Sequence, residues 1–210
     1  MITSLIQTLG GWVVAVISTL GYPGIFLCMT IEGACIPLPS EVILTFSGFL
    51  VSTGRFDFAL AALAGALGNL FGSSIMYYVA LKGGRPFFEK YGKFLLISRS
   101  DLDFGERWFQ KYGDPAIFLG QLLPVVRTYI NLPAGILKMK YVAFAIYDLL
   151  GAIVWSVFLV FIGYKFGQNW KDIEIYFSKF NTLITILVVA AIVFFIYHQV
   201  KKFREIQQEL

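Results

Sequence analysis

The chain has 210 residues, of which 58% are hydrophobic and 14% are charged, and its mean hydropathy is +0.73. Soluble domains carry about 25% charged residues, so this composition predicts an integral membrane protein with several spans. The net charge of +4 is small and no dense cluster of Lys and Arg occurs, which excludes a nucleic-acid-binding protein.

Residues 1–24 are moderately apolar and end in the turn sequence Gly-Tyr-Pro-Gly. Such a segment can form a helix that crosses the membrane with little length to spare. It can equally form an amphipathic helix that lies in the membrane interface, and both arrangements fit the sequence.

Residues 25–54 are an apolar run that is interrupted near its middle by I-E-G-A-C-I-P-L-P-S-E. This interruption contains two carboxylates, Glu32 and Glu41, and two prolines in alternate positions. Alternate prolines do not fit a continuous helix, because each lacks a hydrogen-bond donor and clashes with the preceding turn. A break at membrane depth is tolerated only where it faces protein or a water-filled cavity. We therefore expect a broken helix, in which the second apolar half either turns back or continues across the membrane.

Residues 58–81 form a continuous apolar helix that is long enough to span the membrane. Small residues recur on one face of this helix, at Ala61, Gly65, Gly68 and Gly72. Small side chains allow another helix backbone to approach closely, so this face predicts helix packing rather than a catalytic role.

Residues 82–114 differ in kind, because basic and acidic residues are interspersed along them. Ser100 and Asp101 precede an amphipathic pattern with several aromatic residues, which predicts a capped helix at the membrane surface. We expect an interfacial connector in this region.

Residues 115–140 are a second interrupted apolar segment, in which Pro124 breaks the run and Arg127 follows it. Residues 141–163 are a second plain spanning helix that contains Asp148. Asp148 either belongs to a proton path or, as we favour, bonds to Lys138, Lys140 or Tyr147 near the interface.

Residues 181–200 predict a third spanning helix, and residues 201–210 form a basic tail. Nine of the 17 Lys and Arg residues lie in residues 82–140 when Arg127 is left out. Because cytoplasmic loops carry an excess of Lys and Arg, the connector is expected inside the cell, and the C-terminus with it.

The segments form two similar halves, each with an interrupted apolar segment followed by a plain helix. Interrupted helices in matching positions indicate a transport site near the membrane midplane, and the orientation suggests an inverted repeat. Glu32, Glu41 and Arg127 would otherwise each be unpaired in hydrocarbon, so we expect them to pair across the repeat. That pairing is either a purely structural lock between the hairpins or part of a functional site.

In the functional interpretation, Arg127 and the N-terminus of a half-helix that begins near Ser40 form an anion site. Ser40 is a good N-cap, free amides and the helix dipole favour phosphate, and an arginine can donate two hydrogen bonds to it. Glu32 and Glu41 are then proton carriers, or ion-pair partners of Arg127. Two further side chains can add neutral hydrogen bonds to the substrate: Gln121 and Asn131.

Three motifs, in order along the chain, carry a resemblance to a known family: E-G-A-C-I-P-L-P-S-E at residues 32–41, G-x-x-G-x-x-x-G-x-x-x-x-Y-Y at residues 65–78, and F-L-G-Q-L-L-P-V-V-R-T-Y-I-N-L-P-A-G-I-L-K-M at residues 118–139. Together they resemble the DedA family, the bacterial branch of the SNARE-associated or VTT-domain membrane proteins.

The resemblance implies two facing re-entrant hairpins and transport of lipid across the bilayer, with dependence on the proton motive force as a family theme. Bacterial members are associated with undecaprenyl phosphate or phosphatidylethanolamine, and eukaryotic relatives with lipid scrambling. The family's functional acids fall on Glu32 and, because loop length varies, less directly on Glu41. Its second motif usually has two arginines six residues apart, whereas here Gln121 occupies the first position and Arg127 the second.

We therefore predict an all-α membrane protein that moves undecaprenyl phosphate, with a proton or another cation as a further ligand. The alternative is a flippase or scramblase for phosphatidylethanolamine, whose amine would suit Glu32 and Glu41. A membrane protein with only a structural or stress-response role also fits. We expect neither an enzyme nor a cofactor or metal, because the one histidine, His198, lies at a helix end without partners for catalysis.

Overall fold

The computed structural model describes residues 2–36, 38–91, 99–123, 126–127 and 129–168, and every regular element in these ranges is a helix. The predicted third span (181–200) and basic tail (201–210) lie outside the described residues. The helices are α1 (Ile2–Leu20), α2 (Tyr22–Gly33), α3 (Ser40–Ser52), α4 (Phe58–Tyr91), α5 (Arg99–Tyr112), α6 (Ala116–Gln121), α7 (Asn131–Ile136) and α8 (Tyr141–Gln168).

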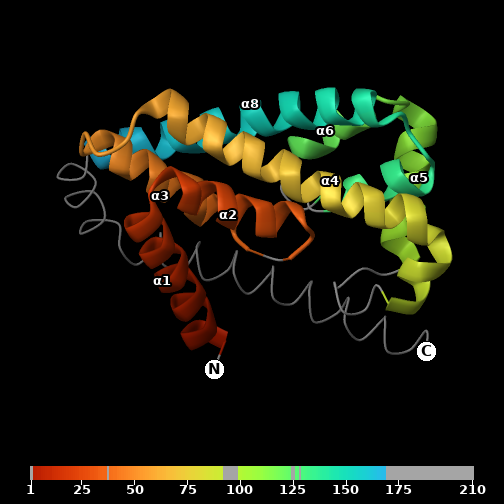
Figure 1. The fold of residues 1–210 in the computed structure, drawn as a ribbon, viewed down its shortest axis with the longest axis horizontal. Helices are drawn as coiled ribbons and strands as arrows, with labels where there is room; N and C mark the ends of the chain where they lie inside the picture. Colours follow the sequence, from red (N-terminus) through yellow and green to blue (C-terminus); the bar gives the residue numbers. More distant parts are fainter. Residues whose placement is uncertain (1, 37, 92–98, 124–125, 128, 169–210) are drawn as a thin grey trace, which may run out of the picture.

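The long helices α4 and α8 lie side by side and run in opposite directions along the longest axis of the molecule (Figure 1). The rings of Phe58 and Tyr164, 6.4 Å apart, join the start of α4 to the end of α8. Both helices are long and apolar enough to cross a membrane. They form the centre on which the shorter helices pack.

Helices α2 and α3 form a helical hairpin with its tip at residues 34–39. At the open end, the Arg55 guanidinium donates to the carbonyl oxygen of Ser18, and the Asp57 N–H donates to the Tyr22 hydroxyl over 2.7 Å. The chain thus returns to the level at which α2 begins. Helix α1 packs against both arms of this hairpin, with Val13 in the core.

Helices α6 and α7 form the arms of a second, shorter segment, in which the chain turns back between Gln121 and Asn131. Gly120 of α6 lies against Ile130, at the start of α7. Ala116 and Met139, at the outer ends of this segment, belong to one hydrophobic cluster together with Tyr77 of α4. The segment therefore reverses direction within the bundle, as the α2–α3 hairpin does.

The two arms of each interrupted segment pack on different long helices. In the first segment, α2 packs on α4 and α3 packs on α8. In the second segment, α6 packs on α8 and α7 packs on α4. Each first arm thus contacts the long helix of its own half, and each second arm contacts the long helix of the other half.

Glycines at two helix crossings allow these close contacts. A Cβ atom on Gly72 of α4 would lie 2.1 Å from the Thr30 carbonyl oxygen of α2. A Cβ atom on Gly163 of α8 would lie 1.9 Å from the Thr45 carbonyl oxygen of α3. Backbone packs on backbone at these points, so neither neighbour has a side chain that could rotate away. The predicted packing face with Ala61, Gly65, Gly68 and Gly72 is confirmed, since all four residues are buried.

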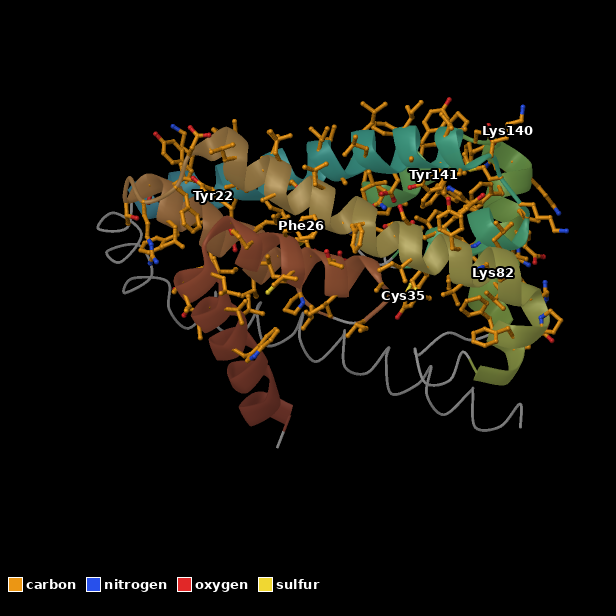
Figure 2. The ribbon with its side chains drawn as sticks, viewed as in Figure 1. Tyr22, Phe26, Cys35, Lys82, Lys140 and Tyr141 are labelled. Carbon is orange, nitrogen blue, oxygen red and sulfur yellow. The ribbon has the colours of Figure 1, made fainter. Side chains whose placement is uncertain are left out.

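The connector is tied to the end of α4 by charged side chains. Helix α4 bends at Gly84, whose φ of 64° is not helical. Arg85 then pairs with Glu89 of its own helix over 2.8 Å, and with Asp103 and Glu106 of α5 over 2.5 Å and 2.8 Å. Helix α5 thus lies at the end of the molecule that also carries Lys82 and Lys140 (Figure 2). The predicted cap at Ser100 and Asp101 falls on side chains outside the described ones.

We expect Gly163→Ala to lower the stability of the fold, because the added methyl group would overlap the α3 backbone. Overpacking of this kind costs about 1–3 kcal/mol, more than the roughly 1 kcal/mol gained in helix propensity from Gly to Ala. The measurement is the thermal unfolding midpoint of the purified protein in detergent.

Gly11→Ala is the matched control, because Gly11 is also helical and a Cβ atom there would meet nothing within 4 Å. This control is expected to leave the midpoint unchanged or slightly raised. Equal midpoints for the two variants would show that the α3–α8 contact is looser than described.

Candidate functional site

The tips of the two interrupted segments meet through Arg127. Its Nη2 donates to Oε2 of Glu32 over 3.3 Å, and its Nη1 donates to Oγ of Ser40 over 3.0 Å. Arg127 is 2% exposed and Glu32 is 3% exposed, so the pair is fully enclosed. The predicted pairing of Glu32 with Arg127 is confirmed.

The long helices supply further contacts to this ion pair. Asn69 of α4 donates its Nδ2 to the same Glu32 oxygen over 3.1 Å. The guanidinium carbon of Arg127 lies 5.1 Å from the ring centroid of Trp155 on α8, within the range of a cation–π interaction. A buried charge pair is tolerated when such additional contacts replace the lost water, so α4 and α8 help to hold the pair in place.

Ser40 has a different role from the one predicted. It is the first residue of α3, the N-cap is Pro39, and no side chain caps the helix. The Ser40 hydroxyl instead accepts the hydrogen bond from Arg127. The prediction that Ser40 is the N-cap is therefore wrong by one position, because the helix already begins at Ser40.

Glu41 does not share in the ion pair. Its side chain is exposed in the first turn of α3, and none of the ion pairs found among the described residues includes it. Adjacent helical residues point about 100° apart, so Ser40 and Glu41 face different directions. The expected pairing of Glu41 with Arg127 is corrected accordingly.

A second buried polar cluster lies beside the ion pair. Gln121 of α6 donates its Nε2 to Oδ1 of Asp148 on α8, and Asn131 of α7 donates its Nδ2 to Oγ of Ser73 on α4 over 2.8 Å. All four residues are buried. The favoured prediction for Asp148, a bond to Lys138, Lys140 or Tyr147, is wrong, because α6 packs on α8 and brings Gln121 against the carboxylate.

Several buried atoms in the two clusters have no hydrogen-bond partner among the described residues. Two are donors next to the ion pair, Nε of Arg127 and Nε1 of Trp155. Others are acceptors, and three of them belong to the second cluster: Gln121 Oε1, Asn131 Oδ1 and Asp148 Oδ2. An unsatisfied buried polar group costs about 1–3 kcal/mol. Most of these atoms lie where the two interrupted segments contact α4 and α8, around Arg127 and Asp148.

Three members of these clusters were not predicted as site residues: Asn69, Ser73 and Trp155. Asn69 and Ser73 lie four residues apart in the small-residue stretch of α4, where polar side chains in an apolar span were the available signal. Trp155 gave no such signal, because tryptophans are common in membrane helices and near their ends.

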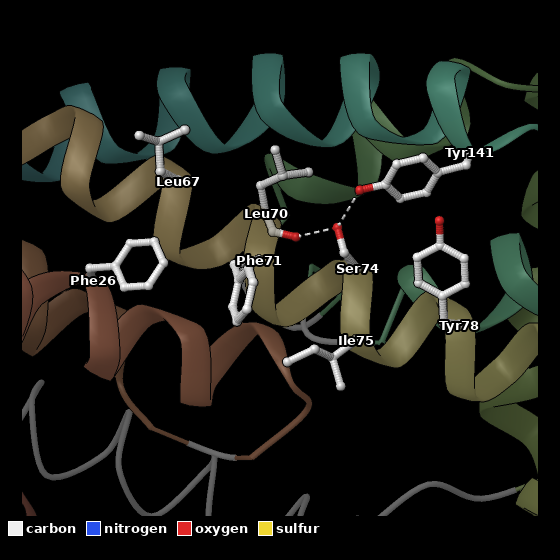
Figure 3. Close-up of a pocket in the computed structure, with 8 residues that line it drawn as sticks. All are labelled: Phe26, Leu67, Leu70, Phe71, Ser74, Ile75, Tyr78 and Tyr141. Atoms are coloured by element: carbon white, nitrogen blue, oxygen red, sulfur yellow. Dashed lines mark hydrogen bonds between the residues drawn. The ribbon is translucent and has the colours of Figure 1, made fainter.

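An apolar groove of about 520 Å³ lies on another face of α4 (Figure 3). It is lined mainly by apolar and aromatic side chains, and its polar atoms include the hydroxyls of Ser74 and Tyr141, 3.2 Å apart. Ser73 is adjacent to Ser74 in sequence but points into the bundle. The groove is thus separate from the buried polar clusters.

The matching family model is that of the VTT domain, which covers residues 38–165. This range includes Ser40, Asn69, Gln121, Arg127 and Asp148. The chain belongs to the VTT-domain family. The resemblance to the DedA family, predicted from the three motifs, is thereby confirmed.

Curated relatives of this VTT-domain protein cover most of its length. It is 37% identical over 199 residues to "Undecaprenyl phosphate transporter A" of Bacillus subtilis (strain 168), covering 95% of this chain and 96% of the relative. A Staphylococcus aureus (strain NCTC 8325 / PS 47) protein of the same name is 25% identical over 195 residues, 91% of this chain and 96% of the relative.

Another relative has a name of a different kind. The "Alkaline phosphatase-like protein" of Lactococcus lactis subsp. lactis (strain IL1403) is 33% identical over 193 residues, 88% of this chain and 90% of the relative. Within the described residues, no group of three or more His, Cys, Asp or Glu side chains is placed to hold a metal ion. No solved structure matches the chain.

We expect the Glu32–Arg127 pair to show strong energetic coupling. Removing one partner of a buried ion pair costs about 3–5 kcal/mol, because the other charge remains buried without compensation. Glu32→Leu and Arg127→Leu should therefore each be strongly destabilising, and the double variant much less so than their sum. The measurement is unfolding of the four proteins in detergent.

Glu41→Leu is the control for this series, because Glu41 is exposed and unpaired in the described structure. Its effect is expected within about 0.5 kcal/mol. Additive effects of the two single substitutions would contradict a direct interaction between Glu32 and Arg127.

Proposed function

We propose that this protein is a transporter, not an enzyme, and that it moves undecaprenyl phosphate across the cell membrane. The proposal is supported by relatives that carry the name of such a transporter over nearly the whole chain. It is also supported by two helices that are long enough to span a bilayer and by polar side chains enclosed between them.

The observation that carries the proposal is a pair of unpartnered donors at Arg127. Nε of Arg127 and Nε1 of Trp155 are buried and have no acceptor in the described part of the chain. Arg127 also donates to Ser40, the first residue of α3, where free backbone amides and the helix dipole favour an anion. A phosphate group provides the acceptor oxygens that these donors lack.

Phosphate would compete with Glu32 for the guanidinium, and Asn69 would keep its hydrogen bond to the released carboxylate. Asn131 retains an unpartnered carbonyl oxygen, so its proposed contribution is to accept a hydrogen bond from bound water or from a protonated phosphate. The proposed contribution of Gln121 is to hold Asp148 beside this site.

The two interrupted segments would enter the membrane from opposite sides as re-entrant hairpins. The packing of the arms on α4 and α8 supports this inverted repeat, because each half repeats the same pattern of contacts. Residues 25–54 and 115–140 then open alternately to the two faces. In this orientation the C-terminus is cytoplasmic.

Phosphatidylethanolamine is the alternative substrate. The exposed carboxylate of Glu41 in the first turn of α3 favours it, because that carboxylate is free to receive an amine. Glu32 is less suited to this role, since Arg127 and Asn69 already donate to it. The unpartnered donors make phosphate the better fit.

We expect Arg127→Lys to reduce movement of undecaprenyl phosphate by 10-fold or more in proteoliposomes, because lysine cannot reproduce the planar set of donors. Trp155→Phe should reduce it about 2–10-fold, which corresponds to one hydrogen bond of about 0.5–1.5 kcal/mol. The measurement is the rate at which labelled lipid becomes accessible on the opposite leaflet.

Arg107→Lys is the matched control, because Arg107 is exposed on α5, and it should leave the rate unchanged. Undecaprenol, which lacks the phosphate, and phosphatidylethanolamine serve as alternative substrates in the same vesicles. Equal rates for undecaprenol and undecaprenyl phosphate would contradict an anion site, and movement of phosphatidylethanolamine alone would establish the alternative.

A further inference from the structure

Asp148 is a buried carboxylate that the proposed phosphate site does not use. It is fully buried in α8, and its Oδ1 accepts a hydrogen bond from the amide of Gln121. Its Oδ2 has no partner within the described ranges. A buried carboxylate in an apolar span is rarely present without a functional reason.

The side chain of Gln121 is left equally incomplete. Its Nε2 donates to Asp148, while its Oε1 is buried without a donor in the residues that the structure describes. A carboxylic acid and a primary amide can join through two antiparallel hydrogen bonds, in which each group both donates and accepts. The structure has the first of these bonds, and Asp148 Oδ2 and Gln121 Oε1, both unpartnered, are the atoms that the second bond would join.

One proton completes this pair. A proton on Oδ2 changes that oxygen from an acceptor into a donor, and it gives Gln121 Oε1 the donor that it lacks. Two acceptor oxygens cannot bond to each other without a hydrogen or a cation between them. A proton is the smallest ligand that would join these two atoms.

Among the described residues, no basic side chain forms an ion pair with Asp148. Its neighbours on α4, α6 and α7 are neutral: Ser73 faces the carboxylate from α4, Gln121 bonds to it from α6, and Asn131 bonds to Ser73 from α7. The charged groups that act on it are Arg127 and Glu32, which are paired with each other. On α3, the exposed Glu41 pairs with none of them.

We propose that Asp148, held by Gln121, is a proton-binding site of this protein. The proton is taken up on Oδ2 from one aqueous face and is released to the other when the bundle opens there. This inference rests on the proposed function, in which a phosphate anion enters the neighbouring site at Arg127. A proton at Asp148 and an anion at Arg127 then occupy the same enclosed space with opposite charges.

The test is infrared difference spectroscopy of the purified protein between neutral and alkaline pH, without added lipid, because exposed carboxylates stay ionised throughout this range. The wild type should show the carbonyl stretching band of a protonated carboxyl group, with its characteristic shift in D2O. Asp148→Asn should abolish this band. The exposed control Asp114→Asn should retain it.

Gln121→Arg gives a second variant that keeps Asp148 itself. A cation beside the carboxylate favours its ionised form, so the protonated band should disappear at neutral pH while the protein remains monodisperse. In proteoliposomes the wild-type transport rate should depend on pH, and the rate of Asp148→Asn should be independent of pH.

A protonated band that survives in Asp148→Asn would overturn the proposal. A band that changes with sodium chloride but not with choline chloride at constant pH would also overturn it, because a metal cation would then occupy the acceptor oxygens. The spectra need no lipid transport, so a failure of the proton site and a failure of the proposed function are separate results.

Discussion

The ion pair between Glu32 and Arg127 is the interaction on which the arrangement of the chain depends. The two side chains come from segments 95 residues apart, and each would be an isolated charge inside an apolar bundle without the other. Pairing them requires the tips of both interrupted segments to meet. The contacts from Asn69 and Trp155 then fix the long helices around that meeting point.

The interior contains unpartnered donors as well as unpartnered acceptors. The donors lie at Arg127 and Trp155, and the acceptors lie at Asp148, Gln121 and Asn131 and also at Asn69 beside the ion pair. In the functions proposed above, an anion would bind at Arg127 and a proton at Asp148. Binding both would offset part of the charge that a phosphate group brings to membrane depth.

The membrane class and the Glu32–Arg127 pair could be predicted from the sequence, because they depend on composition and on the few charges within apolar segments. Glu32 and Arg127 could be paired because an apolar chain offers each of them few partners. Glu41 could not be separated from Glu32 in this way, since its exposure depends on where α3 begins. The hydrogen bond between Gln121 and Asp148 could not be predicted from the sequence either, because it depends on the packing of α6 on α8. Trp155 was missed for the same reason: only the crossing of helices shows that its ring lies under a guanidinium.

Each interrupted segment packs on both long helices, and this arrangement has a mechanical consequence. Each interrupted segment has one arm packed on α4 and the other packed on α8. At Gly72 and Gly163, two of these contacts are direct backbone-to-backbone packing. If α4 slides along α8, both segments are sheared at the same time and by the same displacement. The α2–α3 hairpin and the α6–α7 segment are therefore mechanically coupled, because each of them packs on both long helices.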